Sequence, residues 1–303
     1  AKRKKTKTGV EKITPEEPIQ VEAAPVEAQP QPAKAKKTPV LAIAAVAVIA
    51  VIAGVLFLGK SGGKDENQNQ GGGSQAGGKG GTEGQPATAA QIQAQLKEGL
   101  VAYYPFNGSA KDESGNGNDG EVKGAELTTD RFGKKASAYE FDEDNDSIDL
   151  GNQPGFNIGK GDFSLSCWVQ HTEANNQHFI GKWNRHVAGY WLGDHQHYAH
   201  AGLLDPSGGR PLEAEGGKSL ADGGWHQVSA VFDRDANLVI YVDGVPVATR
   251  DISEESGSID NDESLKISNT FHGSIDEVRI YNRALSAGEV KALYILEHFP
   301  KPK

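Results

Sequence analysis

The sequence predicts an all-β domain, a two-sheet antiparallel jelly-roll sandwich with a short C-terminal helix. Short apolar segments that alternate with a period of two, such as 238–242, are separated by Gly, Asn and Asp. Asp243-Gly244 is a tight-turn signal between 238–242 and 245–249. The pattern continues for about 200 residues from position 99 onward, which is enough to bury a core.

The composition limits the possible function classes. Residues 1–40 carry nine Lys or Arg against five Glu, whereas the remainder carries 22 Lys or Arg against 36 Asp or Glu. An acidic globular part argues against a nucleic-acid partner. The single cysteine, Cys167, excludes an internal disulfide framework. Because Cys167 alternates with apolar residues in 163–169, we expect a buried, unreactive thiol.

Three segments are expected to precede the domain. Residues 1–38 are predicted to be a disordered basic tail in the cytoplasm, since they are rich in Pro, Glu, Gln and Lys. Residues 39–59 are predicted to form one transmembrane helix. Residues 60–87 are rich in Gly, Gln, Ser and Asn and are predicted to be a flexible linker that spans about 30 Å.

The transmembrane prediction rests on Val40 to Leu58, an unbroken apolar run of 19 residues. At about 1.5 Å per residue, such a helix matches the hydrocarbon thickness of a bilayer, so membrane lipid is the expected partner. A secretory signal fits less well, because no small-x-small cleavage site follows the run. The excess of Lys before the run places the N-terminus in the cytoplasm and the C-terminal domain in the periplasm or outside the cell. Ala50 and Gly54 form a small-xxx-small pair, so a homo-oligomer stays open.

Helices are expected at both ends of the domain. Residues 88–98 are predicted to form a short helix whose Ile92 and Leu96 dock on the domain, being four residues apart. After a half-buried strand near 273–281, Ser286 and Glu289 form a capping box that starts a C-terminal helix. Residues 298–303 are expected to be a tail.

Several sequence blocks occur in a set order between residues 99 and 297. They are Gly99–Gly108, Asp112–Gly120, Phe141–Gly151, Phe163–Val169, Trp225–Val228, Leu238–Gly244 and Gly273–Val290. With these blocks the chain resembles the laminin-G-like, concanavalin A-like jelly-roll domains of bacterial surface proteins. The resemblance implies a binding or adhesion module, with carbohydrate or protein as its ligand, and not an enzyme.

A structural calcium ion is expected at one edge of the sandwich. Asp112-Glu-Ser-Gly-Asn-Gly-Asn-Asp119 is a loop of oxygen donors, and its glycines let backbone carbonyls turn inward. The resemblance to laminin-G-like domains implies that this loop approaches the acidic residue of the last strand. The implied Ca²⁺ ligands are Asp112, carbonyls at Gly117 and Asn118, and Asp276. The alternative is that Asp112 only shapes a turn, which Asp276 helps to hold.

A ligand surface is expected in the region 183–198, where aromatic rings and polar donors suited to sugar rings or an extended peptide are concentrated. The candidate residues are Trp183, Arg185, Trp191, His195, His197 and Tyr198. The alternative is that both tryptophans belong to the core and the histidines decorate a rim.

Two kinds of chemistry are disfavoured. A transition-metal site at His195, His197 and His200 would need side chains that the strand pattern sends to opposite faces. Glu140-Phe-Asp142 resembles the Glu-x-Asp pattern of jelly-roll glucanases, but no second glutamate stands where glycosidase chemistry needs one. The sequence therefore predicts a membrane-anchored, non-catalytic recognition module. The alternative from another class is a structural subunit or anchor of an envelope assembly, and a glycoside hydrolase is a third option.

Overall fold

The computed structural model describes residues 89–298, apart from 143–144, 174–175, 185–187, 207–209 and 269. The predicted tail, transmembrane helix and linker lie outside the described residues, as do residues 299–303. Among the helices that are described, none has the length and apolar character to cross a bilayer.

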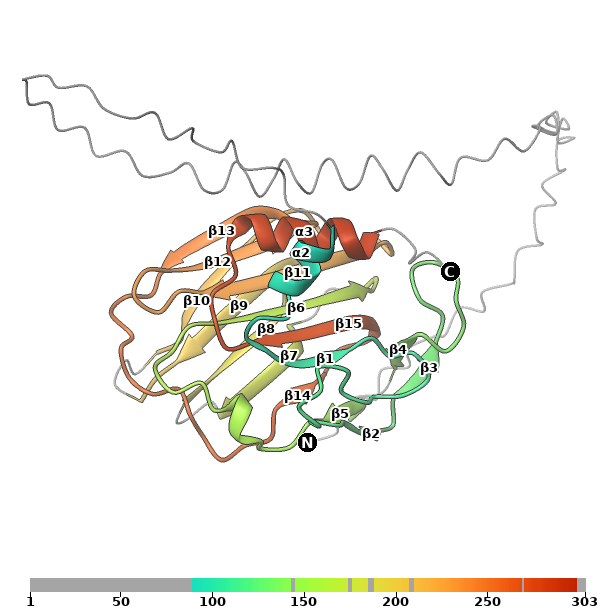
Figure 1. The fold of residues 1–303 in the computed structure, drawn as a ribbon, viewed down its shortest axis with the longest axis horizontal. Helices are drawn as coiled ribbons and strands as arrows, with labels where there is room; N and C mark the ends of the chain where they lie inside the picture. The colour runs from blue at the N-terminus through green and yellow to red at the C-terminus, as the bar shows by residue number, and fades with distance from the viewer. Residues whose placement is uncertain are drawn as a thin grey trace, which may run out of the picture. The chain divides into compact units, whose positions relative to one another are not determined.

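The described residues form two antiparallel sheets that pack face to face, as predicted (Figure 1). Sheet A has the order β13 (Val245–Asp251), β12 (Asn237–Val242), β11 (Trp225–Phe232), β6 (Phe163–Gln170), β15 (Gly273–Tyr281), β4 (Ala138–Phe141) and β3 (Glu126–Thr128), and β1 (Leu100–Tyr104) also pairs with β15. Sheet B has the order β10 (Leu212–Gly216), β9 (Tyr198–Leu204), β8 (Ala188–His195), β7 (Gln177–Asn184), β14 (Lys266–Ile267), β5 (Ser147–Asp149) and β2 (Glu121–Lys123). A short 3-10 helix, η1 (Pro154–Phe156), precedes β6.

The main core lies between the sheets and follows the alternation of the strands. Leu165 and Cys167 of β6 are fully buried and lie opposite Ala230 and Val228 of β11. The prediction of a buried Cys167 is therefore confirmed. Burial raises the pKa of the Cys167 thiol, so it stays protonated and unreactive at neutral pH.

The tight turn between β12 and β13 is also confirmed. Asp243 and Gly244 both have positive φ, 52° and 71°, which is the conformation of a two-residue hairpin turn that matches strand twist. Val242 pairs with Val245 directly across it. Glycine is needed at the second position because this conformation is costly for residues with a Cβ.

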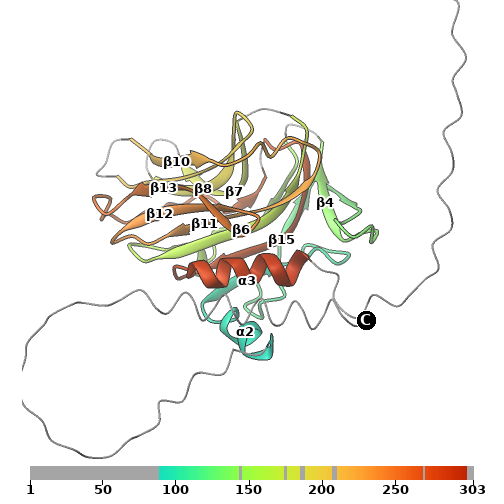
Figure 2. The same cartoon turned by 90° about the horizontal axis from the view of Figure 1, so that it is seen from above.

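Two helices cover the outer face of sheet A (Figure 2). They are α2 (Ala89–Gln95) and α3 (Ala287–His298). Ile92 and Leu96 are buried in one cluster with residues of α3 and of sheet A, as the predicted docking helix requires. The Tyr281 hydroxyl donates to the Leu96 carbonyl at 3.1 Å, which ties the end of α2 to β15.

The capping box of α3 forms as predicted. The Glu289 backbone N–H donates to Ser286 Oγ at 3.3 Å, and the Ser286 backbone N–H donates to Glu289 Oε2 at 2.8 Å. Each side chain thus satisfies a backbone donor that the first turn leaves without an intrahelical partner.

The C-terminal end of α3 is held by a buried ionic network. Glu297 accepts hydrogen bonds from Trp168 Nε1 at 2.6 Å and from Gln227 at 3.1 Å, and it pairs with Arg279. Arg131 donates to the Glu297 carbonyl at 2.6 Å and pairs with Asp276 at 2.5 Å. Because a buried charge without a partner is costly, removal of one member should destabilise the helix contact.

Candidate functional site

Aromatic and histidine side chains gather on the outer face of sheet B, over β7, β8 and β9. The strand register places Trp191 of β8 opposite Gly181 of β7 and Gly202 of β9. A Cβ at Gly202 would lie only 2.4 Å from Trp191 Cζ2, so the indole lies across that glycine. Trp191 is 2% exposed and forms the floor of this surface. The burial of Trp191 supports its interpretation as a packing residue.

Trp183 supplies the accessible ring. It is half-buried at the end of β7, and its ring meets that of Trp191 edge to face, with centroids 4.4 Å apart. His178 lies nearly parallel to Trp191 at 5.8 Å on the other side. Edge-to-face contacts of this kind fix ring orientation as well as adding contact energy. Trp183 is therefore held in place by a buried partner while part of it faces solvent.

His200 ties the floor to the charged edge of the sheet. Trp191 Nε1 lies 3.4 Å from His200 Nδ1, and because an indole N–H only donates, Nδ1 is the acceptor. The proton of the neutral ring then sits on Nε2, which lies 3.7 Å from Glu213 Oε1. Burial lowers the pKa of His200 to about 4, so this neutral form prevails at physiological pH.

The remaining predicted ligand residues lie at the β8–β9 hairpin. His195 Nδ1 is 2.6 Å from Glu215 Oε2, and Tyr198, which pairs with His195, is 42% exposed. His197 belongs to the connecting turn, where its φ is 79°. Arg185 lies outside the described residues. The structure thus brings Trp183, Trp191, His195 and Tyr198 to one face.

Sequence reasoning did not select His178, His200, Glu213 or Glu215 for this surface. The alternation of His200, Gly202 and Leu204 along β9 indicates that these residues share one face of the sheet. The residues beside them on that face belong to other strands, so the sequence alone does not identify them. The interstrand register sets His178 opposite Gly193 and Gly193 opposite His200.

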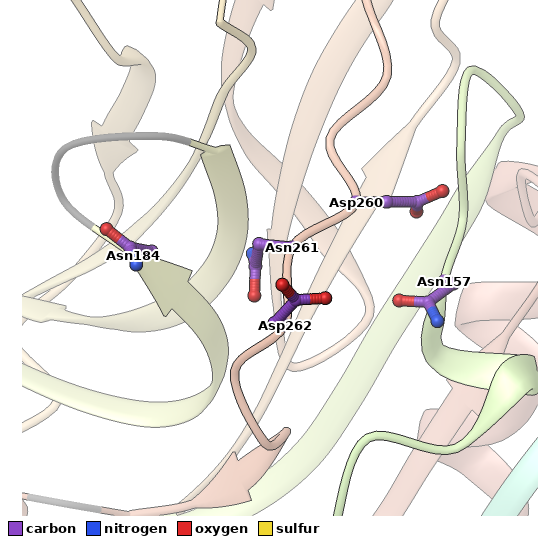
Figure 3. A pocket seen from close by; sticks show the side chains of 5 residues that line it. All are labelled: Asn157, Asn184, Asp260, Asn261 and Asp262. Atoms are coloured by element: carbon purple, nitrogen blue, oxygen red, sulfur yellow. The ribbon is translucent and has the colours of Figure 1, made fainter.

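A polar pocket of about 370 Å³ opens at the end of sheet B where β7 finishes (Figure 3). Its lining consists of amide and carboxylate side chains, from Asn157, Asn184, Asp260, Asn261 and Asp262. In Figure 3, Asn261 and Asp262 lie between Asn184 on one side and Asn157 and Asp260 on the other. The amides donate and accept hydrogen bonds and the carboxylates accept them, so the lining offers both kinds of partner that the hydroxyls of a sugar require.

The pocket wall is anchored from within the sandwich. Lys182 is fully buried, and its ammonium donates to the Asn261 carbonyl, while Asn261 Nδ2 donates to the Ala188 carbonyl at 3.0 Å. The Gly159 backbone N–H donates to Asp260 Oδ1 at 2.7 Å. The wall is thus fixed to β7, β8 and the segment after η1.

A buried charged cluster holds the preceding part of this loop. Arg234 is 4% exposed and donates to the carbonyls of Glu255 and Gly257, the latter at 2.9 Å. The Gly257 backbone N–H donates to Asp205 Oδ2 at 2.8 Å. Burial, followed by the hydrogen bond with Asp205 and the charge of Asp205, raises the pKa of Glu255 to about 7. Glu255 and Asp205 therefore share a proton beside Arg234 at neutral pH.

The predicted calcium ligand Asp112 serves as the centre of a turn. Its Oδ1 accepts the backbone N–H groups of Tyr103 at 3.0 Å and Ser114 at 2.8 Å. Its Oδ2 accepts the Asn118 backbone N–H at 3.0 Å and Ser114 Oγ at 2.9 Å. These four bonds occupy the four lone-pair positions of the carboxylate. In this arrangement Asp112 does not fit a calcium ion, because a cation would have to displace these donors.

Asp276 is engaged elsewhere. Its Oδ2 pairs with Arg131 at 2.5 Å, and its Oδ1 accepts the Glu277 backbone N–H at 2.7 Å. Gly117 has φ 75°, as the turn requires, and the Asn118 carbonyl accepts the Tyr104 hydroxyl at 2.6 Å. Across the part of the chain that the structure describes, no group of three or more His, Cys, Asp or Glu side chains is placed to hold a metal ion. Calcium binding stays a prediction that this donor set does not favour.

The glucanase-like segment lies away from the aromatic surface. Glu140 is exposed on the outer face of sheet A, between the core residues Tyr139 and Phe141 of β4. The second glutamate would be expected at Asp144 or Asn145, and of these two positions Asp144 lies outside the described residues. Glu140 and the Trp183 surface therefore belong to different sheets.

A family model described as the concanavalin A-like lectin/glucanases superfamily matches residues 142–291. This domain belongs to that superfamily. The assignment agrees with the laminin G-like resemblance of the sequence and with the two-sheet sandwich. No curated protein matches the sequence of the laminin G-like domain or of the rest of the chain.

Several solved structures share the fold of the laminin G-like domain. The binding domain of Paraclostridial Mosquitocidal Protein 1 matches with a TM-score of 0.58 and 20% identity, over 66% of this chain and 52% of that one. The binding domain of Botulinum neurotoxin DC in complex with SialylT matches with a TM-score of 0.53 and 14% identity, over 66% and 52%. The same domain in complex with rat synaptotagmin II matches with a TM-score of 0.52 and 13% identity, over 65% and 52%. This chain spans about half the length of these structures, and at such identities the likeness shows the fold.

Proposed function

We propose that this protein is a membrane-anchored recognition module whose laminin G-like domain binds carbohydrate or protein without catalysis. One observation carries the proposal: the half-buried Trp183 and the polar pocket, which Asn184 helps to line, lie at the same end of β7. Because successive side chains of a strand point to opposite faces, the stacking ring lies on the outer side of β7 and the hydrogen-bonding groups lie on its other side, at the same end of the strand.

Saccharides fit this combination. The C–H face of a sugar ring stacks on an aromatic ring, and its hydroxyls need both donors and acceptors. Trp183 provides the ring, preset by its contact with Trp191 at 4.4 Å. Asn184 and Asp262 provide amide and carboxylate groups in the pocket at the same end of β7. A preset ring lowers the entropy lost on binding.

The solved structures support a recognition role in general terms. Those named above are binding domains, one in complex with SialylT and one with rat synaptotagmin II. Their ligands do not transfer to this chain, because function depends on the site and not on the fold. The proposal of a glycan or protein ligand here rests on the residues of sheet B.

Membrane anchoring through residues 39–59 is the second part of the proposal. The apolar run and the Lys residues before it support a single span with the N-terminus in the cytoplasm and the domain periplasmic or extracellular. Protease treatment of intact cells or spheroplasts should degrade the domain and spare the basic tail. Degradation of the tail alone, or release of the protein by alkaline extraction, would contradict the anchor.

The ligand site is tested with the full chain on an array of neutral and acidic oligosaccharides, followed by titration calorimetry of the hits. Trp183→Ala should weaken binding at least tenfold and leave the unfolding midpoint nearly unchanged. Phe132→Ala is the matched control, because Phe132 is 39% exposed and lies outside sheet B. Equal binding by Trp183→Ala and wild type would overturn the site, and a blank array would exclude carbohydrate and leave only a protein ligand.

A structural subunit or anchor in an envelope assembly is the alternative. It is favoured by Val122 and Leu127, which are 38% and 39% exposed on the short edge strands β2 and β3. Leu127→Glu should release the protein from a larger assembly in sedimentation if this role holds. Hydrolase activity, the third option, would appear as new reducing ends during incubation with the bound oligosaccharide.

A further inference from the structure

A second pocket lies on the outer face of sheet A, on the opposite side of the sandwich from the Trp183 surface. Its volume is about 330 Å³, and its lining includes Glu140, Gln170 and Ser274. Nothing in the proposed function uses this pocket, which is formed by the ends of β4, β6 and β15 and by the neighbouring segments that carry Glu173, Gly223 and His272.

The strand register arranges these side chains in one row. Glu140 of β4 lies opposite Ser274 of β15, and Ser274 lies opposite Gln170 of β6. Gln170 in turn lies opposite Trp225 of β11. Residues directly opposite each other share a face, and neighbouring strands are about 4.8 Å apart, so the row extends for about 14 Å. A carboxylate, a hydroxyl, an amide and an indole thus follow one another over the length of a short oligosaccharide.

The described part of α3 covers the row next to this one. In the adjoining row, Trp168 is 2% exposed beneath Tyr294, Arg131 and His298, whose ring lies 6.3 Å away. α3 ends at His298. Trp225 occupies the next row and is half-buried, so part of the residue is exposed to solvent.

The orientation of the polar side chains in this row is partly fixed by hydrogen bonding and burial. Gln170 Nε2 donates to the Gly223 carbonyl at 2.8 Å, which fixes the orientation of the amide. Ser274 is 6% exposed and sits at the bottom, whereas Glu140 is exposed at the rim. A sugar ring stacked on Trp225 would place its hydroxyls toward the amide and the hydroxyl.

The charge at the rim selects among saccharides. Glu140, Asp142 and Glu173 all line the pocket, and His272 Nδ1 lies 3.3 Å from Glu173 Oε2. Three carboxylates beside two imidazoles, those of His171 and His272, attract hydroxyl and ammonium groups and repel carboxylates and sulfates.

We infer that the row Glu140, Ser274, Gln170 and Trp225 is a second saccharide-binding site, which takes neutral or amine-bearing sugars and rejects acidic ones. It is independent of the site on sheet B. The juxtaposition that carries it is the half-buried Trp225 next to a polar pocket, beside the row that α3 covers.

The experiment is titration calorimetry of the full chain with chitosan tetramer, cellotetraose and tetragalacturonate at low ionic strength. Chitosan tetramer should bind tightest and tetragalacturonate weakest. Trp225→Ala should weaken chitosan binding at least tenfold, whereas Trp183→Ala should leave it within twofold. Because Trp225 is half-buried, Glu140→Gln is the second variant: Glu140 is exposed, and its loss should reduce the preference for chitosan over cellotetraose about threefold.

Each outcome bears on one site. Loss of chitosan binding in Trp183→Ala but not in Trp225→Ala would overturn the second site and leave the proposed function standing. Equal affinity for chitosan and tetragalacturonate, or an unchanged preference in Glu140→Gln, would overturn the charge argument and with it the inference. Loss in Trp225→Ala alone would support the second site whether or not sheet B binds a glycan.

Discussion

Glu255→Gln should stabilise the protein at pH 8 and change its stability little at pH 5. The pKa of Glu255 is raised to about 7 in the folded state, where it shares a proton with Asp205, against an ordinary value of 4.5. A carboxyl whose folded pKa is raised favours folding at low pH, and this contribution is lost as pH rises from the unfolded to the folded pKa. The full loss is about 3 kcal/mol, of which about 2.5 kcal/mol falls between pH 5 and pH 8. Gln keeps the shape and donates to Asp205 at every pH, so the variant escapes this loss.

The assay is urea unfolding of both proteins at pH 5 and pH 8, with the free energy of unfolding taken from midpoint and slope. The difference between variant and wild type should grow by about 2.5 kcal/mol across this range. Glu254→Gln is the control, because it removes the same charge from the exposed neighbour and should show no such growth. A difference of the same size at both pH values would refute the shared proton between Glu255 and Asp205.

Three further predictions test packing and turns. Asp112→Ala should cost about 1–3 kcal/mol of stability because it leaves backbone donors of the turn without acceptors, and thermal unfolding should show the same loss in Ca²⁺ and in chelator; a calcium-dependent midpoint that vanishes in the variant would restore the metal site. Gly202→Ala should cost about 1–3 kcal/mol by pressing a methyl group against the Trp191 ring, and adding Trp191→Phe should recover part of it, whereas no loss in the single variant would contradict the packing. Ser286→Ala should cost about 1 kcal/mol in chemical unfolding by removing the cap of α3, and an unchanged midpoint would speak against the capping box.

Local signals in the sequence predicted the local parts of the fold. The Asp243-Gly244 turn, the capping box of Ser286 and Glu289, and the docking of Ile92 each depend on residues close together in the chain or on one helix face. Turn and cap chemistry is encoded within a few residues, so no tertiary information is needed. The same holds for the alternation that buries the inner residues of each strand.

The sites depend on partners that are distant in sequence. The family resemblance implied Asp276 as a metal ligand, and the fold pairs it with Arg131, which is 145 residues away. The floor of the sheet B surface could be identified only from the strand register, which sets Trp191 over Gly202. In the sequence alone, a glycine such as Gly202 indicates a loop or a bulge. Sequence reasoning therefore selected the region 183–198 as a candidate but not its neighbours on the same face, His178 and His200.

The position of α2 bears on how this domain meets its surroundings. The described chain enters the sandwich through α2 on the outer face of sheet A, and the Trp183 surface lies on the outer face of sheet B (Figure 2). Attachment point and contact surface are thus back to back, separated by a helix layer and two sheets, or about 20 Å. A large ligand can settle on sheet B without colliding with whatever holds residue 89. A short ligand of the sheet A row would instead approach from the side on which α2 joins the rest of the chain. The two faces would therefore meet different binding partners.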